Sequence, residues 1–266
     1  MKPLLGTYVE IGSLGTEKFF DMGVDEAFLI IEKVHNLLSF HDPESDLSRL
    51  NNSVNEDIKI NPLTAVILKL ARRITVLSNG LFNFSMGGVL VEQAILPNHF
   101  SKKEIISIGF ADDLQIFGQT ARLKRPILIS LDGIAKGYAV DLAVKKLKEV
   151  GLKSAWVNAG GDLRIFGDIC IPVFRRELSN ELKLIGHFRE TALATSHVNE
   201  FDDIRFQGRI LSANREKLKA GVWSISAPSA WLADALTKVA CVSNPIHTEY
   251  LVKKFGGKLL KINQEY

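Results

Sequence analysis

The chain has 266 residues, of which 46% are hydrophobic and 24% are charged, a composition that is ordinary for a globular protein and argues against intrinsic disorder. The formal net charge of +3 is too small to indicate a nucleic-acid-binding protein, and two cysteines are too few for a disulfide framework. No run approaches the roughly 20 apolar residues of a membrane span, and the N-terminus lacks the apolar core of a secretory signal, so we expect a cytoplasmic protein, or a periplasmic one if an export signal precedes Met1.

The first predicted elements are a strand and a long helix. Residues 7–12 alternate between apolar and polar side chains, which is typical of a strand with one buried face. Residues 24–39 place apolar side chains three and four positions apart, which predicts a helix with one buried stripe.

Two further helices are predicted from their end signals. Asn61 and Pro62 suit a helix N-cap and the first helical residue, and Gly80 suits the position just beyond the end, so a helix should run to about residue 78. Residues 101–104 begin with Ser and end with Glu, which is a capping-box pattern and predicts a short helix.

The middle of the chain contains a predicted strand, a helix and a hairpin. Residues 126–131 form a short apolar run that predicts a strand, and the segment after it has the pattern of a helix that ends at Gly151. Residues 154–158 and 163–167 have strand character and are joined through Gly160-Gly161, which favours a hairpin turn.

The remaining elements complete a mixed pattern. Further strands are expected at 191–196, 222–227 and 258–262, and helices from Pro228 to about 242 and near 248–255. Strands and helices do not alternate strictly, and there is no internal repeat or low-complexity linker. We therefore expect an α+β fold made of a single domain over residues 1–266.

The loop that precedes the middle helix is the best candidate binding site. The N-terminus of a helix offers unpaired backbone N–H groups and a partial positive charge. Gly133 and Gly137 would let a phosphate approach the backbone, and Lys136 adds a full positive charge. The spacing matches neither the Walker motif nor the dinucleotide fingerprint. The alternative is an ordinary tight turn with a solvated lysine.

An acidic residue in an apolar helical stretch is the second candidate. Asp234 is surrounded by alanine and leucine, and burying a carboxylate is costly without a partner. A metal ion or another cation would provide that partner. Lys238 lies one helical turn later and could instead form a common i,i+4 pair with Asp234.

Two other loops carry weaker signals. Residues 80–85 combine aromatic and small side chains and could pack on a planar ring or form a buried turn. Residues 45–51 predict a capped polar turn after the first helix.

Taken together and in this order, these stretches resemble the ApbE family of FAD:protein FMN transferases. The matching pieces are Leu5-Gly6-Thr7, residues 45–51, residues 80–83, Gly133-Ile134-Ala135-Lys136-Gly137-Tyr138 with Asp141, Asn158-Ala159-Gly160-Gly161-Asp162, Ala194-Thr195-Ser196 and Ala233-Asp234-Ala235-Leu236. They span nearly the whole chain, and their shared order is hard to explain by chance.

The resemblance implies two related subdomains around a flavin groove, with Mg²⁺ on the diphosphate of FAD. It implies an enzyme that splits FAD and transfers FMN through its phosphate to a threonine or serine of an acceptor flavoprotein. The residues implied at the FAD site are Leu5, Leu81, Phe82, Asn83, Ser130 and Lys136. The Gly133 carbonyl and Asp234 are implied to face the Mg²⁺, with Thr237 assisting.

Several positions depart from the family pattern. Asn83 and Ser130 stand where the family has aspartates, and Lys238 replaces a threonine one turn after Asp234. The family stretch His-Ile-Ile-Asp-Pro has only residues 209–213 as its counterpart, without histidine or aspartate. His197 is the candidate to replace that histidine, with a solvated loop histidine as the alternative.

These changes remove carboxylates and introduce a lysine. The ammonium of Lys238 could occupy the volume of Mg²⁺ and pair with Asp234, holding phosphate as a point charge. The sequence is compatible with three functions: an active FAD:protein FMN transferase, a non-catalytic flavin-binding scaffold without the metal, and a nucleotide-binding structural protein without flavin.

Overall fold

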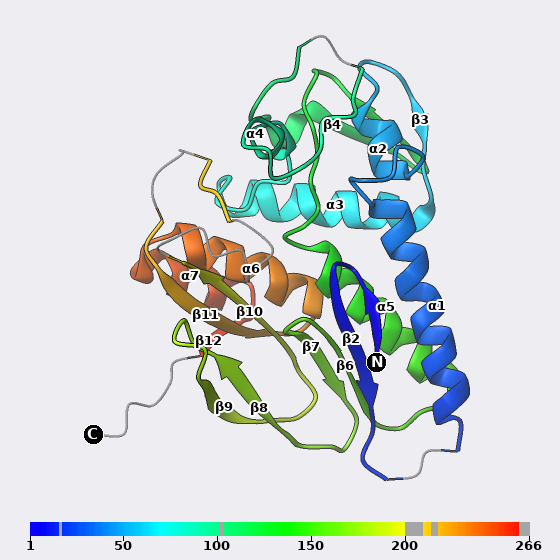
Figure 1. The fold of residues 1–266 in the computed structure, drawn as a ribbon, viewed down its shortest axis with the longest axis vertical. Coiled ribbons are helices and arrows are strands. Elements are labelled where there is room, and N and C mark those ends of the chain that lie inside the picture. The colour runs from blue at the N-terminus through cyan, green and yellow to red at the C-terminus, as the bar shows by residue number, and fades with distance from the viewer. Residues whose placement is uncertain (16–17, 102–103, 200–209, 214–217, 261–266) are drawn as a thin grey trace. The chain divides into compact units, whose positions relative to one another are not determined.

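The computed structural model describes residues 1–15, 18–101, 104–199, 210–213 and 218–260 (Figure 1). The chain divides into two compact units. The first unit comprises residues 1–32, 136–210 and 217–266, and the second comprises residues 33–135 and 211–216. Both contain helices and strands, which confirms the α+β class.

The first unit is built on a seven-stranded antiparallel sheet. The strand order is β1-β2-β6-β7-β10-β11-β12 (Figure 1). The strands are β1 (Lys2–Leu4), β2 (Thr7–Gly12), β6 (Ala155–Ala159), β7 (Asp162–Phe166), β10 (Ala192–Val198), β11 (Gly221–Ala227) and β12 (Lys258–Leu260). A separate hairpin pairs β8 (Ile171–Arg176) with β9 (Leu182–Phe188).

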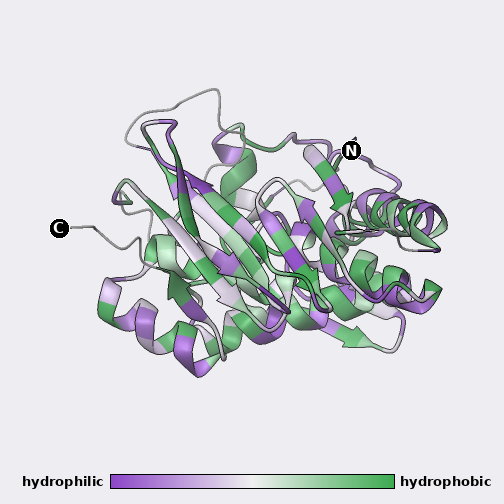
Figure 2. Cartoon of the chain, turned by 90° about the horizontal axis from the view of Figure 1, so that it is seen from below, coloured by the Kyte–Doolittle hydropathy of each residue, from purple (hydrophilic) through white to green (hydrophobic). Residues whose placement is uncertain are grey.

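Helices α5 (Ala135–Val150), α6 (Ala230–Val242) and α7 (Pro245–Lys254) belong to the first unit almost entirely, and α1 (Phe20–Leu38) begins in it. The hydropathy of their residues is drawn in Figure 2, where single helices carry both hydrophobic and hydrophilic stretches. Helix α6 is mostly buried: ten of its thirteen residues are buried, and it packs along β10 and β11. Any charged side chain on its buried side must therefore find a partner inside the protein.

The start of α6 is held by a side chain from α5. Asp141 accepts hydrogen bonds from the backbone N–H groups of Ala230 and Trp231, both at 2.9 Å. A carboxylate at a helix N-terminus satisfies free N–H groups and the helix dipole. Burial raises the pKa of Asp141, and these two hydrogen bonds and Arg164 oppose that rise.

The second unit contains two well-capped helices and a small sheet. Helices α2 (Asp46–Asn51) and α3 (Pro62–Leu77) have the N-caps Ser45 and Asn61. Its other elements are α4 (Gly87–Glu92), the 3₁₀ helix η1 (Ala111–Asp113) and the sheet β3-β5-β4, made of Ile58–Lys59, Thr120–Leu123 and Leu114–Phe117. The predicted helix from Pro62 is confirmed, and the stretch expected as a capped turn at residues 45–51 is the cap Ser45 followed by helix α2.

Two predicted elements of the second unit are wrong. Residues 126–131 form no regular strand, and only Ile127 makes a single bridge, to Ile106. In place of a neighbouring strand, separate groups pair with this segment: the Asn51 amide donates to the Ile129 carbonyl and accepts from the Ile129 N–H, and the Gly87 N–H donates to the Leu128 carbonyl. No helix includes Ser101 or Glu104, and residues 102–103 lie outside the described chain. The Ser101 hydroxyl donates to Asn52 at 2.9 Å and does not cap a helix.

The predicted elements of the first unit are confirmed, with small shifts in their ends. Helix α5 ends at Val150, and Gly151 follows with a φ of 100°, where glycine is favoured. The hairpin turn between β6 and β7 has positive φ at both Gly160 and Gly161. Helix α6 begins two residues after Pro228, and the final strand is described only to Leu260.

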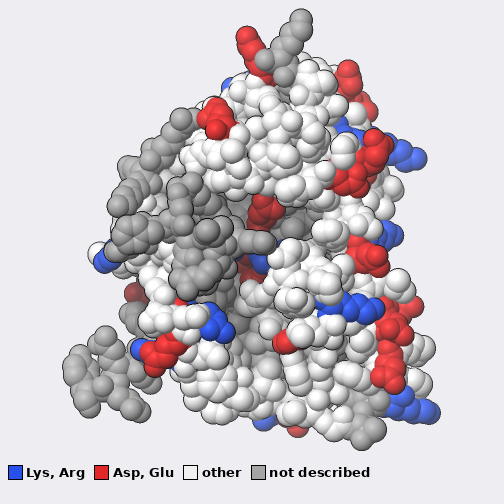
Figure 3. Space-filling model, viewed as in Figure 1, with Lys and Arg blue, Asp and Glu red and all other residues white. Residues whose placement is uncertain are grey.

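The charged surface has no dominant sign on the face drawn in Figure 3, where acidic and basic side chains are interspersed. Within the described ranges, no helix is both long and apolar enough to cross a bilayer.

Candidate functional site

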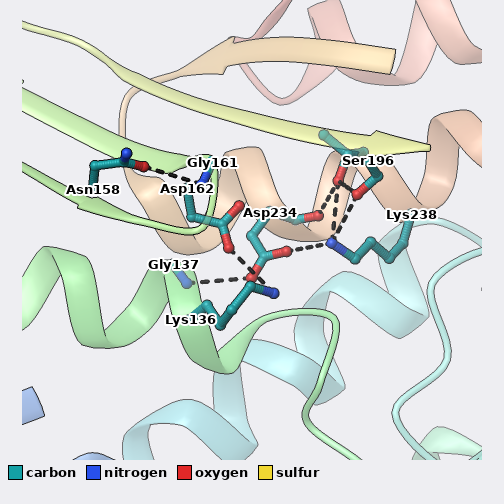
Figure 4. A network of polar contacts seen from close by, with 9 residues as sticks. Lys136, Gly137, Asn158, Gly161, Asp162, Ser196, Asp234 and Lys238 are labelled. Atoms are coloured by element: carbon teal, nitrogen blue, oxygen red, sulfur yellow. Dashed lines mark hydrogen bonds and ion pairs between the residues drawn. The ribbon is translucent and has the colours of Figure 1, made fainter. Parts of the chain in front are cut away.

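A cluster of charged side chains lies inside the first unit, between the beginning of α5, the turn into β7, strand β10 and helix α6 (Figure 4). It contains Lys136, Asp162, Ser196, Asp234 and Lys238. The helical positions place Asp234 and Lys238 on one face of α6, one turn apart.

Asp234 is the centre of this cluster and has no solvent exposure. Its Oδ1 lies 2.5 Å from the Lys238 Nζ, and its Oδ2 accepts a hydrogen bond from the Gly137 N–H at 3.2 Å (Figure 4). Burial opposes ionisation, but the charges of Lys238 and Lys136 and these hydrogen bonds outweigh it and hold the pKa of Asp234 below its usual value. Asp234 is therefore a buried carboxylate that the surroundings keep ionised.

The ammonium of Lys238 is surrounded by oxygen atoms. Besides Asp234, it donates to the Ser196 hydroxyl at 2.9 Å and to the Thr237 hydroxyl at 3.4 Å. The Ser196 and Thr237 hydroxyls lie 2.7 Å apart, and Thr237 also donates to the Asp234 carbonyl at 2.7 Å. Such a connected network fixes each of these side chains in one orientation.

A second ion pair joins Lys136 and Asp162. The Lys136 Nζ lies 3.3 Å from the Asp162 Oδ2. The carboxylate is buried, with a side-chain exposure of 3%, whereas the lysine side chain is 27% exposed. Within the described part of the chain, Asp162 Oδ2 makes no hydrogen bond. Lys136 can therefore meet a ligand from solvent while it stays anchored to the buried acid.

The pKa of Asp162 is raised to about 6. Burial is the main cause and the negative charge of Asp234 adds to it, while Lys136 and Lys238 act in the opposite direction. The two carboxylates and two ammonium groups make the cluster electrically balanced when all four are charged.

Gly137 allows α5 and α6 to approach closely. A Cβ at this position would overlap the carbonyl of Ala230 and would lie 2.7 Å from the Trp231 nitrogen. The approach brings the Gly137 N–H within reach of Asp234. The first turn of α5 thus contributes both Lys136 and a backbone donor to the cluster.

The predicted FAD-site residues lie in both units. In the first unit, Leu5 occupies the turn between β1 and β2 with a φ of 56°, and Lys136 is the second residue of α5. In the second unit are Leu81, Phe82, Asn83 and Ser130.

The two polar residues of this set in the second unit, Asn83 and Ser130, form hydrogen bonds within that unit. Asn83 Oδ1 accepts from the Ser85 N–H at 2.9 Å and from its hydroxyl at 2.7 Å. The Ser130 hydroxyl donates to Asp132 at 2.9 Å. These contacts orient both side chains within the loops that carry them.

His197, the candidate to replace the histidine of the family stretch, lies in a strand and not in the loop that the alternative interpretation assumed. It belongs to strand β10 and is paired with Val222 of β11. It is half-buried, and burial and the nearby charge of Lys238 lower its pKa. The imidazole is therefore neutral near pH 7, the form that can accept a proton.

The Mg²⁺ implied by the family resemblance does not fit the residues present in the first unit. The two predicted ligands there, Asp234 and Thr237, are both engaged with the ammonium of Lys238. Among the described residues, no group of three or more His, Cys, Asp or Glu side chains could hold a metal ion. Gly133, the third predicted ligand, lies in the second unit.

Asp162 and Ser196 are functional candidates to which the sequence analysis assigned no role. Both lie in stretches that carried the family resemblance, and Asp162 follows directly after the Gly160-Gly161 turn. An acid at the first position of a buried strand was the available signal for Asp162. No local pattern marks Ser196, because its contact with Lys238 joins β10 to α6.

The fold matches known structures over nearly its whole length. It aligns with the ApbE protein of Thermotoga maritima at a TM-score of 0.82, with 22% identity and coverage of 96% of this chain and 91% of that one. It aligns with the flavin transferase ApbE of Vibrio cholerae at a TM-score of 0.77, with 19% identity and coverage of 98% and 93%. The chain therefore has the fold of the ApbE flavin transferases.

The sequence comparisons agree. The model of the ApbE family matches residues 5–259, and the chain belongs to that family. An FAD:protein FMN transferase of Rhodobacter capsulatus is 30% identical over 135 residues, which are 46% of this chain and 26% of that protein. An FAD:protein FMN transferase of Vibrio cholerae is 25% identical over 180 residues, 62% of this chain and 53% of that protein. The matched regions thus span about half or less of these relatives.

Proposed function

We propose that the chain is an FAD:protein FMN transferase, which moves FMN from FAD onto a serine or threonine of an acceptor flavoprotein. The observation that carries the proposal is the buried cluster at the start of α5, in a chain whose match to the ApbE family model covers residues 5–259. Lys136, whose side chain is 27% exposed, lies in the first turn of a helix, where the helix dipole also favours an anionic phosphate group.

In this reaction the acceptor hydroxyl oxygen attacks the FMN phosphorus of FAD. A phosphoester bond forms, the bond to the AMP phosphate breaks, and AMP leaves. The hydroxyl proton must go to a base. His197 is neutral, but it directly follows Ser196 in β10, and successive side chains of a strand point to opposite faces of the sheet, so it does not face the cluster that Ser196 contacts and we assign it no role in the transfer. The ammonium of Lys136 balances the charge that develops on phosphate oxygens.

The other contacts to FAD are assigned to Leu5, Leu81, Phe82, Asn83 and Ser130. The apolar members suit the flavin ring system, and the polar ones can hydrogen-bond the ribityl or phosphate oxygens. Because the residues present do not fit Mg²⁺, no step is assigned to a metal ion at Gly133, Asp234 or Thr237.

The proposal is tested by incubating the full chain with FAD and with an acceptor protein that an established FAD:protein FMN transferase modifies. We expect release of AMP, measured by chromatography, and flavin fluorescence that stays with the acceptor in a denaturing gel. FAD that binds and stays intact would instead indicate a flavin-binding scaffold. An absence of FAD binding at near-millimolar concentration would contradict any flavin function.

Replacing Lys136 with methionine should weaken FAD binding by at least about tenfold, because a charge-assisted contact to phosphate contributes about 1.5–3 kcal/mol. The measurement is a calorimetric titration with FAD. The matched control is Lys145→Met on the same helix, where the side chain is 70% exposed and pairs with Glu149. Equal losses in the two variants would contradict the assignment of Lys136 to the phosphate.

A further inference from the structure

The position expected to hold a metal ion is filled by a side chain of the protein. Lys238 Nζ lies at 2.5, 2.9 and 3.4 Å from oxygens of Asp234, Ser196 and Thr237. One carboxylate and two hydroxyls are hard oxygen donors of the kind that bind Mg²⁺. Here they are arranged at hydrogen-bond distances around an ammonium, whereas Mg²⁺ requires oxygens at about 2.0–2.1 Å.

Burial makes this arrangement hard to exchange for a metal ion. Asp234 is fully buried, and the Lys238 side chain is only 20% exposed. A divalent cation that approached Asp234 would face the full repulsion of an ammonium in a region with little water to screen it. Lys238 would have to leave three oxygen partners for the metal to bind.

The charge balance points in the same direction. Asp234 is paired with Lys238, and Asp162 is paired with Lys136. No carboxylate of the cluster is left without a cation, so the cluster does not need a metal ion for neutrality. The side chain of Lys136 is 27% exposed and can therefore also meet a phosphate group from solvent.

We propose that the ammonium of Lys238 is the resident cation of this site, and that the chain therefore binds its diphosphate ligand without a divalent metal ion. The identity of that ligand as FAD rests on the function proposed above. The exclusion of the metal ion from Asp234 rests on the cluster alone.

The experiment measures Mn²⁺ binding to the full chain by electron paramagnetic resonance, in the absence of FAD. We expect the wild-type protein to bind no Mn²⁺ at this site over the concentration range of the titration. The variant Lys238→Thr should bind Mn²⁺ there, with an affinity at least tenfold above the limit set by the wild type. Threonine removes the ammonium and adds a hydroxyl oxygen. The variant Lys253→Thr, on the exposed side of α7, is the matched control and should behave as the wild type.

Two results would overturn the proposal. One is wild-type binding of Mn²⁺ that disappears in Asp234→Asn, and the other is an unchanged Mn²⁺ affinity in Lys238→Thr. Circular dichroism checks that each variant is folded, and Lys238→Gln, which keeps a polar group of similar length without the charge, replaces Lys238→Thr if the latter does not fold. If only the wild type is folded, its own Mn²⁺ spectrum tests the proposal: free Mn²⁺ alone supports the resident cation, and bound Mn²⁺ contradicts it.

Failure of the proposed function would look different. A wild-type chain that binds neither Mn²⁺ nor FAD would support the resident cation and contradict the flavin function. A wild-type chain that binds FAD only when Mg²⁺ is present would support the flavin function and overturn the resident cation.

Discussion

Replacing Lys238 with methionine is expected to lower the free energy of unfolding by about 3–5 kcal/mol at pH 7, because it leaves a buried carboxylate without its counter-charge. Methionine keeps much of the lysine volume, so the loss reports on charge and hydrogen bonding more than on packing. Asp234 cannot turn to solvent, since it is fully buried and its other oxygen is held by the Gly137 N–H. Urea denaturation of the wild type and the variant measures the difference.

The loss should depend on pH in a defined direction. In the wild type the pKa of Asp234 is held below its usual value, so the stability it contributes is present at neutral pH and is lost as the pH falls through that low pKa. Without Lys238, burial would raise the pKa of Asp234, and the variant could relieve its cost by binding a proton. The difference between the two proteins should therefore be largest at neutral pH and shrink toward acid.

The double variant Lys238→Met with Asp234→Asn is the control for this interpretation. It removes both charges, so it should recover most of the stability that Lys238→Met loses. Loss of an exposed ion pair lowers the free energy of unfolding by less than about 1 kcal/mol. A loss that small in Lys238→Met would contradict a buried ion pair between Asp234 and Lys238.

The second large effect is expected for Gly137→Ala, which should destabilise the protein by about 3 kcal/mol. In an unobstructed helix, the same change would be favourable by roughly 0.5–1 kcal/mol. Here the new Cβ would meet backbone atoms of Ala230 and Trp231, which cannot rotate away as a side chain can. The start of α6 is in turn held in place by Asp141.

Thermal and urea denaturation of Gly137→Ala measure this loss, and Gly23→Ala in α1 is the matched control. A Cβ at Gly23 would meet the flexible ends of Leu152 and Leu147, at 2.8 and 3.2 Å, and these can shift. We expect the control to stay within about 1 kcal/mol of the wild type. Equal stability of Gly137→Ala and the wild type would show that α5 and α6 are not in such close contact.

Local sequence signals predicted the long helices well, because caps and periodicity act within a few residues, but the capping-box pattern at residues 101–104 predicted a helix that the described part of the chain does not contain there. The end of α5 at Gly151 and the hairpin at Gly160-Gly161 depend on backbone conformations that glycine favours, and both are confirmed. Residues 126–131 could not be predicted in this way. Their backbone groups pair with separate distant segments: the side chain of Asn51, 78 positions away, pairs with Ile129, and the Gly87 N–H donates to the Leu128 carbonyl.

In the candidate site, too, contacts within one helix could be predicted and contacts between elements could not. The pair of Asp234 and Lys238 follows from helical spacing and could be predicted, although the sequence left a metal ion open as the alternative. The contact of Ser196 with Lys238 and the ion pair of Asp162 with Lys136 join different elements, and only the folded chain brings them together.

The most direct measurement of the central claim, that Lys238 provides the cation of this site, is a calorimetric titration of the wild-type chain with FAD in EDTA and again in excess Mg²⁺. A resident ammonium predicts dissociation constants that agree within about twofold, since the cation is already part of the protein. FAD binding that appears only with Mg²⁺, or that Mg²⁺ tightens by about tenfold or more, would contradict the claim.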